Sequence, residues 1–377
     1  MELTKAIFDY IESHKDEARE LLITLAQIPA PSNHEEKRAE FCLNWLKKQG
    51  AEGVYIDDAL NVVYKLGFDE NKPTTVYMAH SDVVFPDTEM LPLIIEDGKI
   101  YCPGVGDDTA NAVALLMAAK YIAEKKITPK DSRLLLVINS GEEGLGNLKG
   151  SRKIVEDFGD DMKEFITFDG YSYGIMNRAV GSKRFRVTLD TEGGHSYAKF
   201  GNKNAIHLLA ALVCDLYGVK VPEKGKTTYN VGIINGGTSV NTIAQHAEML
   251  YEFRSDERES LDYMQGEFDK IIDIHKGRGE NIKVTLVGDR PCSGVVDALA
   301  EEALACRASS AIEKHFGYIP SRGSGSTDCN IPLSKGIPSV CLGCVTGGGA
   351  HTREEYVNIE SLLPGIRVAF EMILSHF

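Results

Sequence analysis

A run of five apolar residues, Leu134-Leu135-Leu136-Val137-Ile138, limits the possible folds of this chain more than any other segment. A strand with only apolar side chains is buried on both faces, which is typical of parallel strands covered by helices. Short apolar runs also occur at 62–64, 75–79 and 165–168, and a helical pattern fills 110–124. This alternation predicts the α/β class, with a mixed sheet flanked by helices.

The pattern changes near residue 181. Phe185, Val187 and Leu189 alternate with polar residues, as in a sheet with one solvated face. Further strands are expected at 231–234, 247–253 and 282–286, with helices at 205–216 and 261–275. The α/β character then returns, with helices at 296–313 and 359–375 and a strand around residue 340. We therefore expect a discontinuous catalytic domain, 1–180 with 291–377, interrupted by an α+β domain at 181–290.

The charge balance excludes some partners. The chain carries 41 basic and 55 acidic residues, a net charge of −14, and such a surface repels phosphate backbones and anionic lipid. Nucleic acid and membranes are therefore not expected partners. No signal-peptide pattern opens the chain, and no apolar stretch approaches the roughly eighteen residues of a spanning helix. We expect a cytoplasmic protein with reduced cysteines, and Cys341 with Cys344 lacks the second pair of a zinc site.

Polar residues follow two of the apolar strands. His80 and Asp82 come after the strand at 75–79, where ligands of α/β sheets collect. A carboxylate two residues from a histidine can accept its ring N–H and orient it for a metal. Ser140-Gly141-Glu142-Glu143-Gly144 follows the most apolar strand, and its two glutamates point in different directions, so one can bind a metal while the other moves a proton. A polar strand end and a solvated acidic turn are the respective alternatives.

Three further segments carry candidate ligands. Gly104-Val105-Gly106-Asp107-Asp108-Thr109 opens the alanine-rich helix but meets neither nucleotide-binding fingerprint. Its acids could cap the helix, or Asp107 could reach a cation. Asp169 precedes a glycine and also fits a turn. His351 follows three glycines, where the backbone can approach a ligand closely, although an incidental histidine in a mobile loop is equally consistent.

The joint occurrence of these residues is more specific than any one of them. They supply two imidazoles and at least three carboxylates, which suits two divalent ions about 3.5–4 Å apart. The set is His80, Asp107, Glu142, Glu143, Asp169 and His351.

In this order, the motifs resemble those of the metallopeptidase family that contains peptidase T, glutamate carboxypeptidase, aminoacylase and succinyl-diaminopimelate desuccinylase. The resemblance covers nearly the whole chain. It implies that His80 and Asp169 bind one metal, that Glu143 and His351 bind the other, and that Asp107 bridges both. It further implies that Asp82 orients His80 and that Glu142 is the general base.

The inserted domain is similar to the lid and dimerisation domain of that family, which implies a homodimer. Gly193-Gly194-His195-Ser196 is similar to the segment whose histidine reaches the substrate carbonyl, often from the partner subunit. The segment 236–241 is similar to a substrate-binding loop that ends in Asn241, and Arg254 matches a strand-borne arginine. The segment 325–328 is similar to a substrate-side loop without assigned roles. One departure is Thr109, where many members have lysine, which changes the local charge but keeps the carboxylate ligand.

Metal-assisted amide hydrolysis is the expected activity. Mixed imidazole and carboxylate ligands favour zinc, with cobalt or manganese as alternatives. In the family, aspartate at the position of Asp169 accompanies peptidases that act at a free amino terminus. We therefore expect a di- or tripeptide aminopeptidase resembling peptidase T. The alternatives are an N-acyl-amino-acid deacylase or desuccinylase, and a non-catalytic relative that binds peptide or metal.

Overall fold

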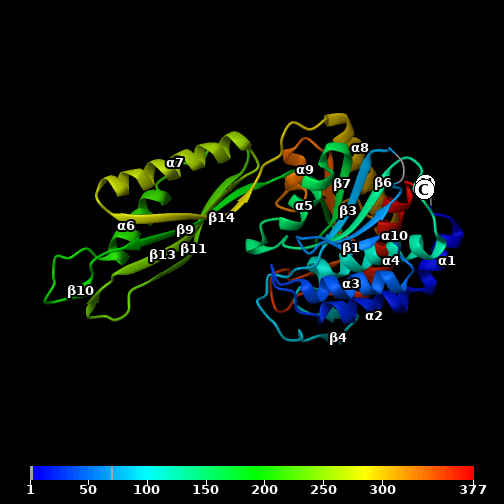
Figure 1. The fold of residues 1–377 in the computed structure, drawn as a ribbon, viewed down its shortest axis with the longest axis horizontal. Helices are drawn as coiled ribbons and strands as arrows, with labels where there is room; N and C mark the ends of the chain where they lie inside the picture. Colours follow the sequence, from blue (N-terminus) through cyan, green and yellow to red (C-terminus); the bar gives the residue numbers. More distant parts are fainter. Residues whose placement is uncertain (1–2, 69–70) are drawn as a thin grey trace. The chain divides into compact units, whose positions relative to one another are not determined.

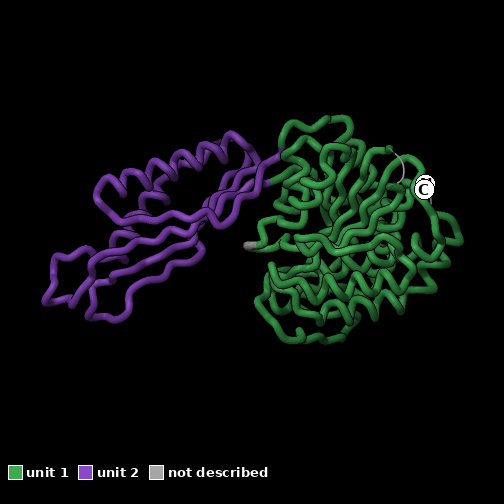
Figure 2. Tube along the Cα trace, in the orientation of Figure 1, with its two compact units in different colours: residues 1–179, 294–377 green, residues 180–293 purple. Residues whose placement is uncertain are grey.

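The chain forms two compact units in the computed structural model, which describes residues 3–68 and 71–377 (Figures 1 and 2). Unit 1 comprises residues 1–179 and 294–377, and unit 2 comprises residues 180–293. The chain therefore leaves unit 1 once and returns to it. The expected boundaries, at 181 and 290, lie close to the junctions between these units.

The main sheet of unit 1 is mixed and has eight strands, as far as the described residues show. Its central strands β6, β3, β7 and β16 are mutually parallel, β2 is antiparallel to both neighbours, and β8 is antiparallel to β16. The expected mixed sheet with flanking helices is confirmed. The order is β1 (Val54–Ile56), β2 (Val62–Leu66), β6 (Arg133–Asn139), β3 (Thr74–His80), β7 (Met162–Phe168), β16 (Ser339–Leu342), β8 (Gly174–Ala179) and β15 (Ser321–Gly325).

Helices cover both faces of this sheet because its central strands are apolar on both faces (Figure 1). In β6, Leu134, Leu136 and Ile138 belong to the larger core, whereas Leu135 and Val137 belong to a second core. The larger core takes in α1 (Lys5–Ser13), α2 (Lys15–Ala26), α3 (Glu36–Lys48), α4 (Ala110–Lys125), α8 (Ala298–Phe316) and α10 (Leu362–Leu374). The second core takes in α5 (Lys149–Phe158) and α9 (Asn330–Ser334).

A small antiparallel sheet, which was not predicted, lies beside the turn that precedes α4. Its strands, in order, are β17 (Gly347–Gly348), β18 (Tyr356–Asn358), β5 (Lys99–Tyr101) and β4 (Ile94–Glu96). The strands are too short to show a hydrophobic period. The pairing of β18 with β5 brings the segment after His351 next to the segment before Asp107.

Unit 2 contains an antiparallel four-stranded sheet with α6 (Ala205–Tyr217) and α7 (Arg258–Gly277) packed against it. Phe185, Val187 and Leu189 are buried, which explains their alternation with polar residues. The sheet order is β11 (Thr227–Gly236), β13 (His246–Ser255), β9 (Gly181–Asp190) and β14 (Asn281–Arg290). A separate two-stranded ladder joins β10 (Gly194–His195) to β12 (Thr242–Ile243).

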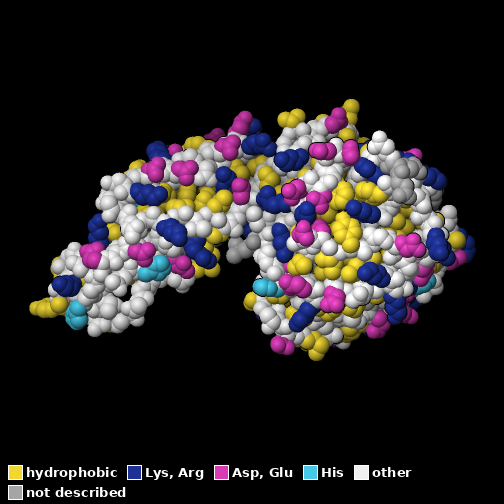
Figure 3. Space-filling view, in the orientation of Figure 1, with side chains coloured by type: hydrophobic (Ala, Val, Ile, Leu, Met, Phe, Trp, Pro, Cys, Tyr) yellow, Lys and Arg dark blue, Asp and Glu magenta, His cyan; other side chains and the backbone are white. Residues whose placement is uncertain are grey.

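Acidic and basic side chains are interspersed on the visible face of each unit (Figure 3). Among the helices of the described residues, none combines the length and the apolar character needed to cross a membrane.

Candidate metal centre

Three neighbouring parallel strands end at one edge of the main sheet and bring three predicted segments together. β3 ends at His80, which is in register with Asn139 at the end of β6. β7 ends at Phe168, immediately before Asp169. Parallel strands present their carboxyl ends at the same edge, so His80, Asp169 and the Glu142–Glu143 pair gather there.

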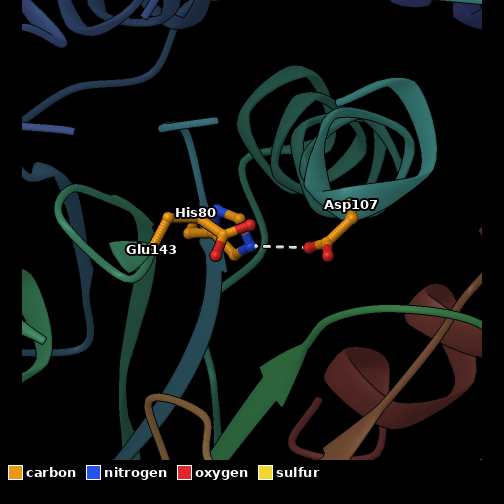
Figure 4. A group of neighbouring side chains, drawn as sticks. All are labelled: His80, Asp107 and Glu143. Carbon is orange, nitrogen blue, oxygen red and sulfur yellow. Dashed lines mark hydrogen bonds and ion pairs between the residues drawn. The ribbon is translucent and has the colours of Figure 1, made fainter. Parts of the chain in front are cut away.

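The carboxylate of Asp107 lies between two imidazoles. Its Oδ1 is 3.0 Å from Nε2 of His80, and its Oδ2 is 3.2 Å from Nε2 of His351. A turn over Val105–Thr109, in which Asp107 itself has non-helical backbone angles, carries Asp107 to this position before α4, and the Asp107–Asp108 peptide bond is cis. Figure 4 shows the Asp107 carboxylate directed at the ring of His80. Each oxygen of one carboxylate therefore faces a different candidate metal position.

The remaining candidate ligands lie on either side of Asp107. Oδ1 of Asp169 is 3.9 Å from Nε2 of His80, and Oε1 of Glu143 is 3.0 Å from Nε2 of His351. His351 has a left-handed backbone conformation, with φ of 63°, in the turn between β17 and β18. The structure thus brings all five predicted ligands together: His80 with Asp107 and Asp169, and His351 with Asp107 and Glu143.

The donor set fits divalent metal ions. Ligand atoms of His80, Asp107 and Glu143 lie within 4.8 Å of one another, as do those of His80, Asp108 and Asp169. In the second group, Asp108 is already committed, because it accepts the backbone N–H of His80 at 2.9 Å and the side-chain amide of Asn111 at 2.5 Å. Asp107 is therefore the better ligand of the adjacent pair. Nitrogen and oxygen donors in this mixture suit zinc and similar ions.

The pKa values of two acidic residues of the centre are shifted by burial and by their neighbours. Burial, and then the negative charge of Asp107, raise the pKa of Asp169 to about 7. Burial opposes ionisation of Asp107 as well, but hydrogen bonds from His351 and His80 outweigh it and hold the pKa of Asp107 below its usual range. A bound cation would favour the ionised form of Asp169.

The pKa values of the two histidines are also raised. Burial lowers the pKa of His80, but nearby carboxylates, Asp108 foremost, outweigh burial and hold it well above the usual value. Hydrogen bonds to Asp107 and Glu143 raise the pKa of His351 to about 10. Both shifts favour the protonated form of the rings beside these carboxylates.

Asp82 contacts His80 differently from the expectation. Nδ1 of His80 donates to the backbone carbonyl oxygen of Asp82 at 3.0 Å, whereas the Asp82 carboxylate is 3.5 Å away. A carbonyl oxygen only accepts, so Nδ1 carries a proton and Nε2 faces the centre. The Asp82 carboxylate instead accepts Ser32 Oγ at 2.6 Å and the backbone N–H groups of Glu142 and Glu143 at 3.0 and 2.9 Å.

Two buried residues at the centre were not predicted. Arg38 donates to the carbonyl oxygens of Ala26, Ile28 and Ser81 and to Oγ1 of Thr109. Even with its pKa lowered to about 10 by burial, it is cationic at neutral pH. Its spacing from the buried Ala39, Cys42 and Leu46 of α3 is the signal that could have revealed it, since an arginine on an apolar helix face needs partners.

Glu355 is the second unpredicted residue. Its carboxylate accepts backbone N–H groups of the turn before and at Asp107. Burial, outweighing those hydrogen bonds, raises its pKa to about 7. In the sequence it belongs to the run Arg353-Glu354-Glu355, which resembles an ordinary solvated turn.

Unit 2 holds the three remaining predicted residues. His195 and Asn241 lie on adjacent segments, since His195 pairs with Thr242 and the backbone N–H of Ser196 donates to the carbonyl oxygen of Asn241. Arg254 is near the far end of β13 and forms an ion pair with Glu252. It lies eight residues beyond His246, about 26 Å along the strand at ~3.3 Å per residue. The structure therefore groups His195 with Asn241 but not with Arg254.

Two other features singled out in the sequence are the 325–328 segment and the closely spaced cysteines. Asp328, in the 325–328 segment, accepts the side-chain amide of Asn139 at 2.7 Å, next to the end of β3. Cys341 and Cys344 are buried free thiols.

The chain is similar in sequence to known proteins. Residues 76–375 match the family described as "Peptidase family M20/M25/M40". The uncharacterised protein YqjE of Bacillus subtilis is 26% identical over 367 residues, which cover 91% of this chain and 94% of that protein. Succinyl-diaminopimelate desuccinylase of Paraburkholderia xenovorans is 25% identical over 245 residues, 62% of each chain.

Solved structures share the fold. The aminopeptidase PepT of Bacillus cereus superposes with a TM-score of 0.71 at 22% identity, covering 95% of this chain and 98% of that one. A tripeptidase of Staphylococcus aureus superposes with a TM-score of 0.74 at 23% identity, covering 96% and 98%.

Proposed function

The chain belongs to peptidase family M20/M25/M40, and from that membership we propose that it is a two-metal aminopeptidase acting on di- and tripeptides. The single observation that carries the proposal is the position of Asp107, whose two carboxylate oxygens face His80 and His351 at 3.0 and 3.2 Å. Bridging carboxylates of this kind reduce the repulsion between two close dications. His80 and Asp169 would hold one ion, and Glu143 and His351 the other.

Bound ions, most suitably zinc, with cobalt or manganese as alternatives, would supply Lewis acidity toward a water molecule and the scissile carbonyl. Glu142 takes the proton of the attacking water and later delivers it to the leaving amine. Its buried backbone is fixed by Asp82, which supports a base held in one place. The two adjacent carboxylates thus have different proposed roles, Glu143 as a metal ligand and Glu142 as the general base.

His195 is proposed to donate a hydrogen bond to the oxyanion. The backbone N–H groups of Tyr197 and Ala198 point at its Nδ1, at 3.3 and 3.4 Å. Nδ1 is therefore an acceptor, which leaves Nε2 as the ring nitrogen that can donate. One well-placed oxyanion donor is worth about 3 kcal/mol of transition-state stabilisation. Asn241, on the adjacent segment, and Arg254 are proposed to bind substrate.

A homodimer is proposed on the exposure of the edge strand β11. Ile233 and Ile234 are about half exposed, at 50% and 53%, on a strand that has a neighbour on one side only in its sheet. Unpaired edges with apolar side chains favour pairing with another copy. Unit 2 is accordingly proposed to be the lid and dimerisation domain, and the whole protein to be cytoplasmic.

The substrate class rests on Asp169, because aspartate there accompanies aminopeptidases in the family. The neighbours described as an aminopeptidase and a tripeptidase support this assignment. An N-acyl-amino-acid deacylase or desuccinylase is the second candidate, favoured by the desuccinylase relatives. Assays of a tripeptide panel beside acetyl and succinyl amino acids distinguish the two. Turnover of only the acylated compounds would reverse the order.

Catalysis itself is tested with the Glu142→Ala variant. We expect it to retain both metal ions and to lose turnover by orders of magnitude, because it removes the base and leaves the ligands. Metal analysis of the wild-type protein after gentle purification and reconstitution with zinc or cobalt is the companion measurement. A wild-type protein that binds no metal, or a variant with full activity, contradicts the proposal.

A further inference from the structure

The carboxylate of Glu355 holds the turn that carries Asp107. Its Oε2 accepts the backbone N–H of Gly104 at 2.9 Å, and its Oε1 accepts those of Gly106 and Asp107 at 2.8 and 2.7 Å. Glu355 is 1% exposed, so all three hydrogen bonds are buried, where a hydrogen bond is stronger than in water. Successive backbone N–H groups around one anion form a rigid concave site.

The backbone of Glu355 is tied to the same region. Its carbonyl oxygen accepts the N–H of Cys102 at 3.1 Å, and the next residue, Tyr356, pairs with Tyr101. Its own N–H donates to the carbonyl oxygen of Thr352 at 3.4 Å, which closes a turn over 352–355 directly after His351, in the loop between β17 and β18. One residue therefore connects the turn of Asp107 to the loop of His351, although the two are far apart in sequence.

The packing around this connection leaves no room for a side chain at Gly106 or Gly347. A Cβ on Gly106 would lie 2.8 Å from Cε1 of Tyr171 and 3.2 Å from Oε1 of Glu355. A Cβ on Gly347 would also lie 2.8 Å from Cε1 of Tyr171. The Tyr171 ring therefore fills the space between glycines of the two ligand-bearing loops. These glycines are required for close packing, not for mobility.

From this geometry we propose that Glu355 is a positioning residue of the metal centre, which sets the Asp107 carboxylate relative to His351 and so fixes where the bridging ligand lies. The inference rests on the proposed two-metal function. Glu355 does not belong to either group of candidate ligands. Both of its oxygens are occupied by backbone N–H groups, so it acts through Asp107.

The test uses Glu355→Gln in the full-length protein. Glutamine keeps the volume and one acceptor oxygen but places an NH₂ group against a backbone N–H, so at least one of the three hydrogen bonds is lost. Glu354→Gln, at the exposed neighbour, is the matched control for the loss of charge. Ile373→Val, in the buried face of α10, is the control for a loss of stability without a change at the centre.

Two measurements do not depend on turnover. In the metal-free protein, hydrogen exchange of the amides of residues 104–107 should be faster in Glu355→Gln than in the wild type and both controls. In zinc titrations, Glu355→Gln should bind the ions about 10–100-fold more weakly, as for other residues that orient ligands, whereas both controls should match the wild type. In the loaded enzyme, kcat should fall with little change in KM.

The outcomes are separable from those for the proposed function. Glu355→Gln with wild-type exchange at 104–107 and wild-type zinc affinity overturns the positioning role. Equal loss of zinc affinity in Ile373→Val also overturns it, because stability alone then explains the effect. A wild-type protein that binds fewer than two ions refutes the two-metal function itself, and the exchange measurement still decides whether Glu355 anchors the turn.

Discussion

One carboxylate oxygen of Asp82 accepts the backbone N–H of Glu142 at 3.0 Å. The other accepts the backbone N–H of Glu143 at 2.9 Å, and the carbonyl oxygen of Asp82 fixes the ring of His80. A residue expected to orient one histidine therefore also fixes the proposed base and a proposed ligand of the second metal. Asp82 therefore contacts residues of both proposed metal positions.

Asp82→Asn should reduce kcat by about 10–100-fold or more and weaken metal binding, because asparagine offers one acceptor oxygen to two N–H groups. Steady-state kinetics and zinc titration measure the two effects. Ser32→Ala removes only the hydroxyl donor to the same carboxylate and should cost less. If Asp82→Asn retained wild-type kcat and zinc affinity, the Glu142–Glu143 segment would not depend on this carboxylate.

Arg38→Met should lower the free energy of unfolding of unit 1 by about 2–4 kcal/mol, since it leaves buried carbonyl oxygens without a donor. The carbonyls are those of Ile28 and Ser81, because that of Ala26 still accepts the Cys102 thiol at 3.5 Å. Urea denaturation measures the change. Lys37→Met, at the exposed neighbouring position, should have little effect. Equal stability of the two variants would mean that Arg38 is not needed to hold these segments.

Metal binding should release protons and strengthen as pH rises. The pKa of His351 is about 10 and that of Asp169 about 7 in the metal-free protein. His351 and Asp169 must both be unprotonated to bind metal. The affinity for metal therefore falls as the pH drops below 10, where His351 becomes protonated, and falls further below pH 7, where Asp169 does too. Each proton released changes the affinity about tenfold per pH unit. Calorimetry at pH 8 in buffers of different ionisation enthalpy should show at least one proton released, and zero release would contradict the assignment.

His376 should make unit 1 less stable in acid. The ring of His376 contacts Tyr77 and Ser132. Burial, and then the positive charge of Arg307, lower its pKa to about 4. Because this folded-state pKa lies below the unfolded value of about 6.5, the neutral ring favours the folded state. This contribution to stability is fully present above pH ~6.5 and is lost as the pH falls toward 4.

His376→Asn removes this titration. Between pH 7 and 4.5 the wild type should lose about 2 kcal/mol more stability than the variant. Calorimetric melting temperatures across that range measure the difference. Parallel pH profiles for the two proteins would show that His376 does not contribute to acid sensitivity.

The strand-end residues could be predicted because apolar periodicity locates the ends of buried strands. His80, Glu142 and Asp169 each follow such a run, and the rule that parallel strands end at one edge then groups them. The fold class followed from the same pattern. Some helix and strand boundaries differ from the predicted ones because of local interactions. The helix expected from residue 296 begins at Ala298 because Asp297 caps it, accepting the N–H groups of Leu299 and Ala300.

The unpredicted parts depend on contacts that a sequence pattern does not encode. β15 has the sequence Ser-Arg-Gly-Ser-Gly and is held by backbone pairing with β8, so it gives no apolar signal. Glu355 meets the N–H of Asp107, which is 248 residues away. Such contacts follow from how loops close in space, and local propensity carries no information about them.

The interruption of unit 1 by residues 180–293 has a consequence for biosynthesis. A ribosome produces His80, Asp107, Glu143 and Asp169 long before His351, Glu355 and the covering helix α10. Unit 2 can fold in the interval because its sheet and helices are contiguous in sequence. The candidate centre can therefore be completed only after unit 2 and the last part of unit 1 have been made, which places the assembly of this site late in maturation.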